Sequence, residues 1–212
     1  LVRTATGARP QAGISFLLID MKSPGITIRP IRTIDGDSEI NEVFLENVEV
    51  PAANLIGTEG EGWGLAKVLL EHERFIMSNA ARSRRDLEAL RAILPGDAGL
   101  SGRLAALDVE LLALEYLEMR LLSTLAAGRN PGPRTSALKI RGTEIAQAIA
   151  RLRLDIATCL APDAAALGQA PLDVLDNALE TWLNLRKITI WGGSNEIQRN
   201  VMARAVLNLP KE

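Results

Sequence analysis

The segment from Trp191 to Asn200 combines residue types that could bind a ligand. It reads Trp-Gly-Gly-Ser-Asn-Glu-Ile-Gln-Arg-Asn. Two adjacent glycines permit a tight turn and the close approach of a ligand to the backbone. Ser194 or Asn195 can cap a following helix, whose free N–H groups favour an anionic or polar partner. By residue type and spacing alone, an ordinary capped helix start is the favoured interpretation.

The elements that position this segment are predicted to be helices. From Gly60 onward the hydrophobic period is that of helices, and a first long helix runs from Trp63 to a stop at Pro95-Gly96. Leucines spaced three or four residues apart predict the second long helix. The further predicted helices lie at about 102–128, 134–157 and 173–190, with a short one after Ser194 that ends by Pro210. Long helices with apolar stripes favour an antiparallel bundle.

The first part of the chain has strand and turn chemistry instead. Short apolar or alternating runs at 13–19, 26–29 and 43–50 are separated by turn residues such as Pro24-Gly25. The chain starts with Leu1-Val2, which looks like the end of a strand, so we expect it to begin within a domain. The predicted fold is mainly α: part of an antiparallel β-domain at 1–57, then an antiparallel helical bundle at 58–212.

Composition narrows the possible partners. The formal net charge is −2, from 24 Lys plus Arg and 26 Asp plus Glu, and no basic stripe interleaved with aromatics is present, so nucleic acid is not an expected partner. No apolar run approaches the roughly 20 residues of a membrane span. The single cysteine, Cys159, cannot form an internal disulfide, which favours a reducing, cytoplasmic location. No metal site is expected.

Two segments resemble one known family. The C-terminal segment Gly-Gly-Ser-Asn-Glu-Ile-Gln-Arg-Asn, followed by Ala-Arg-Ala-Val-Leu-Asn-Leu-Pro, is similar to the C-terminal motif of acyl-CoA dehydrogenases. Residues 13–64 resemble the end of that family's β-domain and the start of its helical domain. The resemblance implies an FAD-dependent oxidoreductase that removes the α-proton of an acyl-CoA thioester and transfers hydride from the β-carbon to flavin.

The resemblance also implies where the catalytic base lies. Many members place a glutamate immediately before the Gly-Thr or Gly-Ser of the C-terminal motif, but that position is Gly192 here. Isovaleryl and long-chain acyl-CoA dehydrogenases place it on the first long helix, before an arginine. Glu73 and Arg74 match that pattern, so we expect Glu73 to be the base and Arg74 its organising neighbour. Without the resemblance, Glu-Arg on a helix would indicate a solvated charged face.

Further residues take roles by the same resemblance. The Gly192 backbone N–H is expected to bind the thioester carbonyl. Gly193, Ser194 and Glu196 are expected to contact FAD, and Trp191 to lie beside the acyl pocket. Ser194, Glu196 and Trp191 could equally be a helix cap, a surface residue and a core residue, respectively. The implied partners are an acyl-CoA substrate, an electron-transferring flavoprotein that accepts electrons, and either a second copy or a related subunit.

Three functions remain open at the level of sequence. Two family segments that help hold the adenine half of the flavin, Arg-x-x-Phe-Gly and Gln-x-x-Gly-Gly, are missing from the middle of the chain. The protein could be an active dehydrogenase using Glu73, a non-catalytic or half-site subunit of a heteromeric dehydrogenase, or a helical interaction module without flavin. The sequence favours the first. It does not identify the acyl chain, nor distinguish a dehydrogenase from an oxidase.

Overall fold

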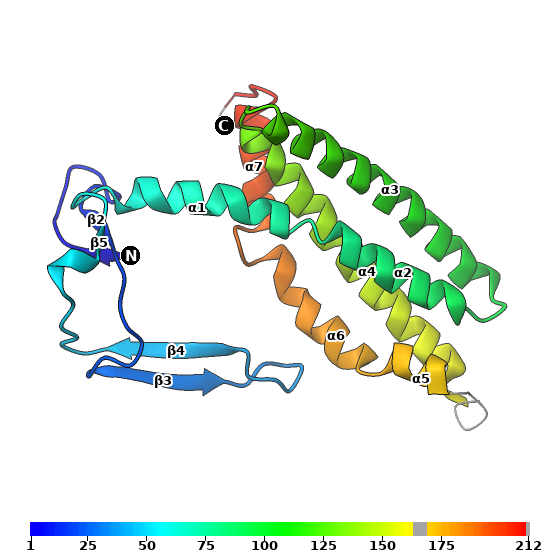
Figure 1. The fold of residues 1–212 in the computed structure, drawn as a ribbon. Helices are drawn as coiled ribbons and strands as arrows, with labels where there is room; N and C mark the ends of the chain where they lie inside the picture. The colour runs from blue at the N-terminus through cyan, green and yellow to red at the C-terminus, as the bar shows by residue number, and fades with distance from the viewer. Residues whose placement is uncertain (163–168, 211–212) are drawn as a thin grey trace. The chain divides into compact units, whose positions relative to one another are not determined.

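The chain divides between His72 and Glu73 into two units, which are described separately. The computed structural model describes residues 1–162 and 169–210, and within these it leaves the side chains of 71–76 and 170 undescribed. Figure 1 labels the helices and strands. The architecture is mainly helical with small antiparallel sheets, which confirms the predicted fold class.

The first unit contains two small antiparallel sheets. Strands β1 (Val2–Arg3), β2 (Ile14–Leu17) and β5 (Leu55–Ile56) form one sheet in the order β1-β2-β5. Strands β3 (Ile26–Ile31) and β4 (Ile40–Leu45) form a hairpin, with Ile26 opposite Leu45 and Ile31 opposite Ile40. A single 3-10 turn, η1 (Ala52–Asn54), precedes β5.

The predicted first long helix is broken, and that prediction was wrong. The structure has α1 (Gly62–Ile76) and α2 (Ala80–Ala92) instead. Asn79 has φ 51°, a left-handed conformation that a continuing α-helix does not allow. The break at 77–79 is held from both sides: the Ser78 hydroxyl donates to Glu118 Oε1 at 2.6 Å, and Gly142 lies against the Ser78 backbone.

Two long helices form the centre of the second unit. Helix α3 (Ala98–Ala126) starts at an Asp97 cap, whose carboxylate accepts from the Leu100 N–H at 2.7 Å. Helix α4 (Ser136–Leu160) follows the short 3-10 helix η2 (Gly132–Thr135) and packs against α2, α3, α6 and α7. Figure 1 shows α3 and α4 side by side. The core is aliphatic and includes Leu87, Leu111, Leu138, Ile145, Leu152 and Ile156.

The last part of the chain is also more divided than its hydrophobic pattern predicts. A single helix was expected over 173–190, but the structure has α5 (Gln169–Leu175), α6 (Ala178–Asn184) and the 3-10 helix η4 (Leu185–Thr189). Asn177 between α5 and α6 has φ 55° and ends the first of them. Helix α7 (Asn195–Ala205) completes the unit. No described helix has the length and apolar character that a membrane span requires.

Candidate functional site

The turn between η4 and α7 has the geometry that its glycines suggest. Gly192 and Gly193 have φ values of 60° and 82°, in the left-handed region that residues with a β-carbon adopt at an energetic cost. Ser194 caps α7, because its hydroxyl accepts from the Ile197 N–H at 3.4 Å. Of the two predicted capping candidates, Ser194 is therefore the cap. Asn195 has a different task.

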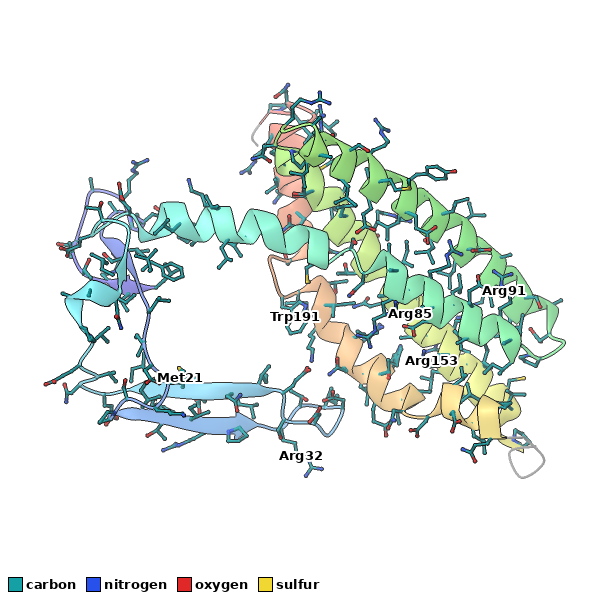
Figure 2. All side chains as sticks on the ribbon, viewed as in Figure 1. Met21, Arg32, Arg85, Arg91, Arg153 and Trp191 are labelled. Atoms are coloured by element: carbon teal, nitrogen blue, oxygen red, sulfur yellow. The ribbon has the colours of Figure 1, made fainter. Side chains whose placement is uncertain are left out.

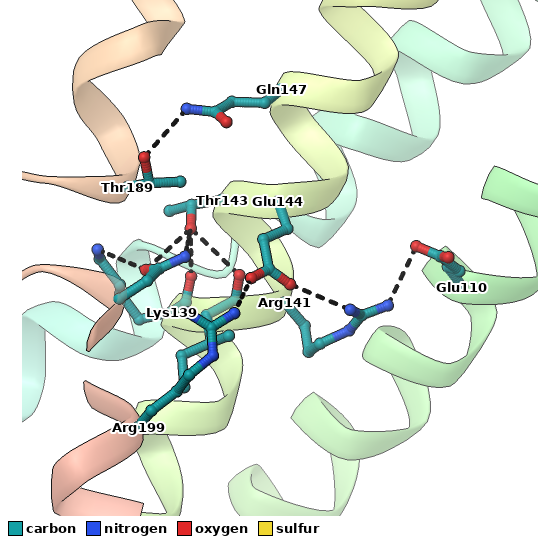
Figure 3. Close-up of polar contacts among 10 residues, drawn as sticks. Glu110, Lys139, Arg141, Thr143, Glu144, Gln147, Thr189 and Arg199 are labelled. Carbon is teal, nitrogen blue, oxygen red and sulfur yellow. Dashed lines mark hydrogen bonds and ion pairs between the residues drawn. The ribbon is translucent and has the colours of Figure 1, made fainter. Parts of the chain in front are cut away.

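Asn195 is buried beneath the turn, where it bonds to two side chains of α4. Its amide is 3% exposed, and its Oδ1 accepts from Lys139 Nζ at 2.8 Å. Its Nδ2 donates to Thr143 Oγ1 at 3.2 Å, and that hydroxyl donates to the Lys139 carbonyl oxygen at 2.8 Å. Figure 3 shows this cluster between α4 and the start of α7. The first residue of α7 is thus fixed to α4.

A third polar side chain of α4 holds the segment that precedes the turn. Gln147 Nε2 donates to the Leu185 carbonyl at 2.8 Å and lies 3.3 Å from Thr189 Oγ1. Lys139, Thr143 and Gln147 are spaced four apart, so they form one row along α4. Figure 3 shows the row from Lys139 to the Gln147–Thr189 contact. The turn at 190–194 is therefore held to α4 on both its sides.

The open side of the turn is available to a ligand. Gly192 and Gly193 are exposed, and among the described groups, which leave out the side chains of 71–76 and 170, neither of their N–H groups has a protein acceptor. A β-carbon placed at Gly192 would lie 3.5 Å from Met77 Cε, so the break between α1 and α2 meets this turn. The backbone at Gly192 can therefore donate to a bound group.

Two charges lie close to the start of α7. Burial lowers the pKa of the fully buried Lys139 ammonium, and the Glu196 carboxylate partly opposes this effect. The pKa of Glu196 is lowered chiefly by its own backbone N–H, then by Ser194, and less by Arg199 and Lys139. Glu196 is therefore an ionised acceptor, exposed on the first turn of α7.

The structure gives positions for most of the predicted site residues, and their predicted roles stay predictions. Gly192, Gly193, Ser194 and Glu196 lie together at the turn and the first turn of α7. Trp191 is 44% exposed beside them, with Lys187 Nζ 5.0 Å from its ring centroid. The side chains of Glu73 and Arg74, near the end of α1, lie outside the described residues, so their roles stay predictions.

Sequence reasoning did not single out the polar row of α4, which consists of Lys139, Thr143 and Gln147. Their spacing was a usable signal, because polar residues four apart among buried aliphatic neighbours share one helix face. A buried lysine in such a row requires a hydrogen-bonding partner.

Arg82, Arg84 and Arg91 of α2 form ion pairs within the protein. Arg84 donates through Nε and Nη2 to the two carboxylate oxygens of Glu115, each at 2.9 Å, and also contacts Asp108. These pairings raise the pKa of Arg84, with the Glu115 hydrogen bond the largest cause. Arg91 also pairs with Asp108, at 2.8 Å. Figure 2 shows Arg85 and Arg91 on α2, Arg153 on α4 and Trp191 after η4.

This chain is similar over its whole length to members of one known family. Residues 60–207 match the family model described as "Acyl-CoA dehydrogenase, C-terminal domain". Acyl-CoA dehydrogenase FadE34 of Mycobacterium tuberculosis is 35% identical over 214 residues, which cover 100% of this chain and 29% of that protein. Acyl-CoA dehydrogenase IpdE1 of the same organism is 31% identical, over 100% of this chain and 55% of the relative. The chain thus spans about half or less of these curated relatives.

Solved structures show the same fold. The ChsE4-ChsE5 complex from Mycobacterium tuberculosis matches with a TM-score of 0.78 and 27% identity, over 98% of this chain and 56% of the matched chain. A structure described as "Tcur3481-Tcur3483 steroid ACAD" has a TM-score of 0.83 at 23% identity, over 99% of this chain and 56% of that one. At that identity, the second likeness supports the fold alone.

Proposed function

We propose a function from the premise that this chain belongs to the acyl-CoA dehydrogenase family. The chain is proposed to be the C-terminal part of an FAD-dependent enzyme that acts on an acyl-CoA thioester. In this proposal residues 58–212 are the helical domain and residues 1–57 are the end of a β-domain. The reaction is removal of the α-proton with loss of hydride from the β-carbon. Family members are oxidoreductases of this kind, and the chain supplies one side of the site.

The exposed Gly192 turn is the observation that carries the proposal. A thioester α-proton is weakly acidic, so its removal requires a hydrogen bond that stabilises the negative charge developing on the carbonyl oxygen. The Gly192 N–H has no acceptor within the described residues, and the turn that holds it is fixed on both sides to α4. A donor that is already oriented can stabilise that charge without rearranging during the reaction.

Glu73 is the proposed base. A carboxylate shielded from water can take a proton from carbon, because shielding raises its proton affinity toward the working pH. Met77, whose Cε meets the Gly192 position, comes four residues after Glu73 in the chain, or about one helical turn. This placement supports a base on the last turn of α1. Arg74 is proposed to organise it.

The residues at the start of α7 fit a flavin nucleotide. The helix start and the exposed Gly193 offer N–H groups to polar or anionic atoms, and the ionised Glu196 is suited to accept from sugar hydroxyls. We therefore propose Gly193, Ser194 and Glu196 as cofactor contacts, and Trp191 as a wall of the acyl pocket. FAD, when bound, supplies the hydride acceptor.

The whole protein is proposed to work in an assembly. An electron-transferring flavoprotein is the proposed electron acceptor, and the chain is expected to associate with a second copy or with a related subunit. The match to a chain of the ChsE4-ChsE5 complex supports the proposal of a related partner. Light scattering of the full-length protein, alone and co-expressed with any adjacent homologous gene, distinguishes the two assemblies.

The test of the function is anaerobic flavin reduction by the full-length protein. A panel of acyl-CoAs of different chain length and branching should bleach the flavin absorbance with at least one member. Glu73→Gln keeps size and hydrogen bonding but removes the proton acceptor, so reduction should fall by at least about 10²-fold while the thioester still binds.

Glu71→Gln is the matched control for the base. It removes a carboxylate two positions away, which a helix directs to a different side. Glu71→Gln should keep most of the wild-type rate. Full activity of Glu73→Gln would refute the base assignment, and a full-length protein that binds no flavin would refute the proposed function.

A further inference from the structure

The polar row of α4 is costly as a purely structural device. Lys139 is 0% exposed, and burial lowers the pKa of its ammonium, which means that burial disfavours the charged form. An aliphatic side chain among Leu138, Ile145 and the other core residues would avoid this desolvation. A reason other than packing is therefore needed for a lysine here.

The ammonium fixes the orientation of one amide. Lysine has only donors, so the oxygen of Asn195, rather than its nitrogen, must face Nζ. The Asn195 Nδ2 then donates to Thr143 Oγ1, and the Thr143 hydroxyl donates a hydrogen bond to the Lys139 carbonyl oxygen. The donors and acceptors are matched at every step. The Asn195 side chain is consequently held in one buried orientation, two residues after Gly193.

Gln147 supplies the matching restraint before the turn. Its amide nitrogen holds the Leu185 carbonyl and approaches Thr189, three residues before Gly192. The segment from Thr189 to Asn195 is thus held at both ends by one rigid helix. Between the two restraints, Gly192 and Gly193 have no side chain of their own to fix them.

We infer that Lys139, Thr143 and Gln147 are positioning residues that fix the Gly192 N–H for carbonyl polarisation, an inference that rests on the proposed function. They act through Asn195 and η4 and do not touch the substrate. Replacing these three side chains should shift the Gly192 N–H by a fraction of the length of the hydrogen bond that it donates. A misplacement of about 1 Å can reduce a rate by roughly 10²-fold.

The experiment uses full-length flavoprotein with Lys139→Met and Thr143→Val. Both changes keep approximate side-chain size and remove the polar contact to Asn195. Each should slow single-turnover flavin reduction by about 10- to 100-fold. Flavin content and the Kd of the thioester should remain close to wild type, while the thermal midpoint should fall modestly because the buried Asn195 loses a hydrogen bond. Thr143→Ser restores the hydroxyl and should recover the wild-type rate.

The ionisation of a bound substrate analogue separates positioning from a purely structural role, because a purely structural role would leave it unchanged. In a 3-thia-acyl-CoA, sulfur replaces the carbon that gives up hydride, so the α-carbon can ionise on the enzyme without reducing the flavin. A weaker hydrogen bond to the carbonyl raises the pKa of that carbon. The pH titration of the analogue's long-wavelength absorbance should therefore move to higher pH in Lys139→Met and Thr143→Val.

The control is Arg151→Met on the same helix. Arg151 is exposed and pairs with Asp155 at 3.0 Å, so its loss should leave rate and ionisation unchanged. Wild-type rates in Lys139→Met and Thr143→Val would overturn this inference but not the proposed function. Loss of flavin or stability with unchanged ionisation of the analogue would also overturn it. A wild-type protein that no acyl-CoA reduces would overturn the proposed function and this inference together.

Discussion

Gly142 of α4 lies against Ser78 so closely that a β-carbon at position 142 would stand 2.2 Å from the Ser78 carbonyl oxygen. The neighbouring atom is backbone, so no side-chain movement relieves the clash. Gly142→Ala should therefore destabilise the second unit by about 1–3 kcal/mol, the range of overpacked sites. Chemical denaturation of the full-length protein measures this change.

Gly102→Ala is the control for that substitution. Gly102 lies within α3, and a β-carbon there would meet nothing within 4 Å. Alanine is preferred to glycine inside a helix by about 1 kcal/mol, so Gly102→Ala should stabilise the protein slightly. Equal effects of the two variants would contradict the packing argument at Gly142.

Asp108 should make stability depend on acid pH. Its hydrogen bond from Arg84, with further help from Arg91, lowers its pKa below the ordinary 3.8. A carboxylate with a lowered pKa in the folded state contributes stability that is fully present above pH 3.8 and is lost as the pH falls through the lowered pKa. Denaturation midpoints of the wild type should fall across that window.

Asp108→Asn should flatten this acid dependence. At neutral pH the variant should lose about 1 kcal/mol or less, since ion pairs that solvent still reaches contribute little. Glu180→Gln, which removes an exposed carboxylate at the start of α6, is the comparison. An Asp108→Asn variant with the full wild-type acid dependence would show that other carboxylates are responsible.

Leu111 tests the aliphatic core of the bundle. It is 0% exposed on α3, in contact with the cluster that joins α2, α3 and α4. Leu111→Ala should lower the free energy of unfolding by about 2–5 kcal/mol, because buried methyl and methylene groups are lost and a cavity remains. Leu111→Met keeps the volume and should lose less than about 1.5 kcal/mol. Similar losses in both variants would indicate that the site collapses or is strained.

Periodicity predicted the helices of the second unit but not their breaks. Apolar residues continue at helical spacing through 77–79 and 176–177, so the pattern predicts one helix at each place. The breaks depend on left-handed backbone at Asn79 and Asn177. At Asn79, the contact of Ser78 with Gly142 involves residues more than 60 positions apart. Such a contact exists only in the assembled bundle.

The glycine turn was predictable because its residue types have few alternatives. Adjacent glycines before a serine indicate positive φ and a helix cap, and the structure has both. The buried partner of Asn195 was less apparent, since lysine is rarely fully buried. Its role becomes visible only when α4 and α7 are packed together.

The last prediction separates backbone strain from steric clash at the two glycines. A β-carbon at Gly192 would meet only Met77 Cε at 3.5 Å, an ordinary contact, while φ is 60°. Gly192→Ala should thus lose about 1–2 kcal/mol from strain alone. Gly192→Asn should lose less, because asparagine adopts the left-handed region more readily.

At Gly193 both effects act together. Its φ is 82°, and a β-carbon would lie 2.5 Å from Gln198 Nε2, in a side chain that is buried. Gln198 would have to move, and its contacts at 3.5 Å with the carbonyls of Gly192 and Gly193 would change. Gly193→Ala should therefore destabilise more than Gly192→Ala, and asparagine at 193 should not recover the loss. Chemical denaturation of the four variants measures these losses of stability. A larger loss for Gly192→Ala than for Gly193→Ala would refute the assignment of strain and clash.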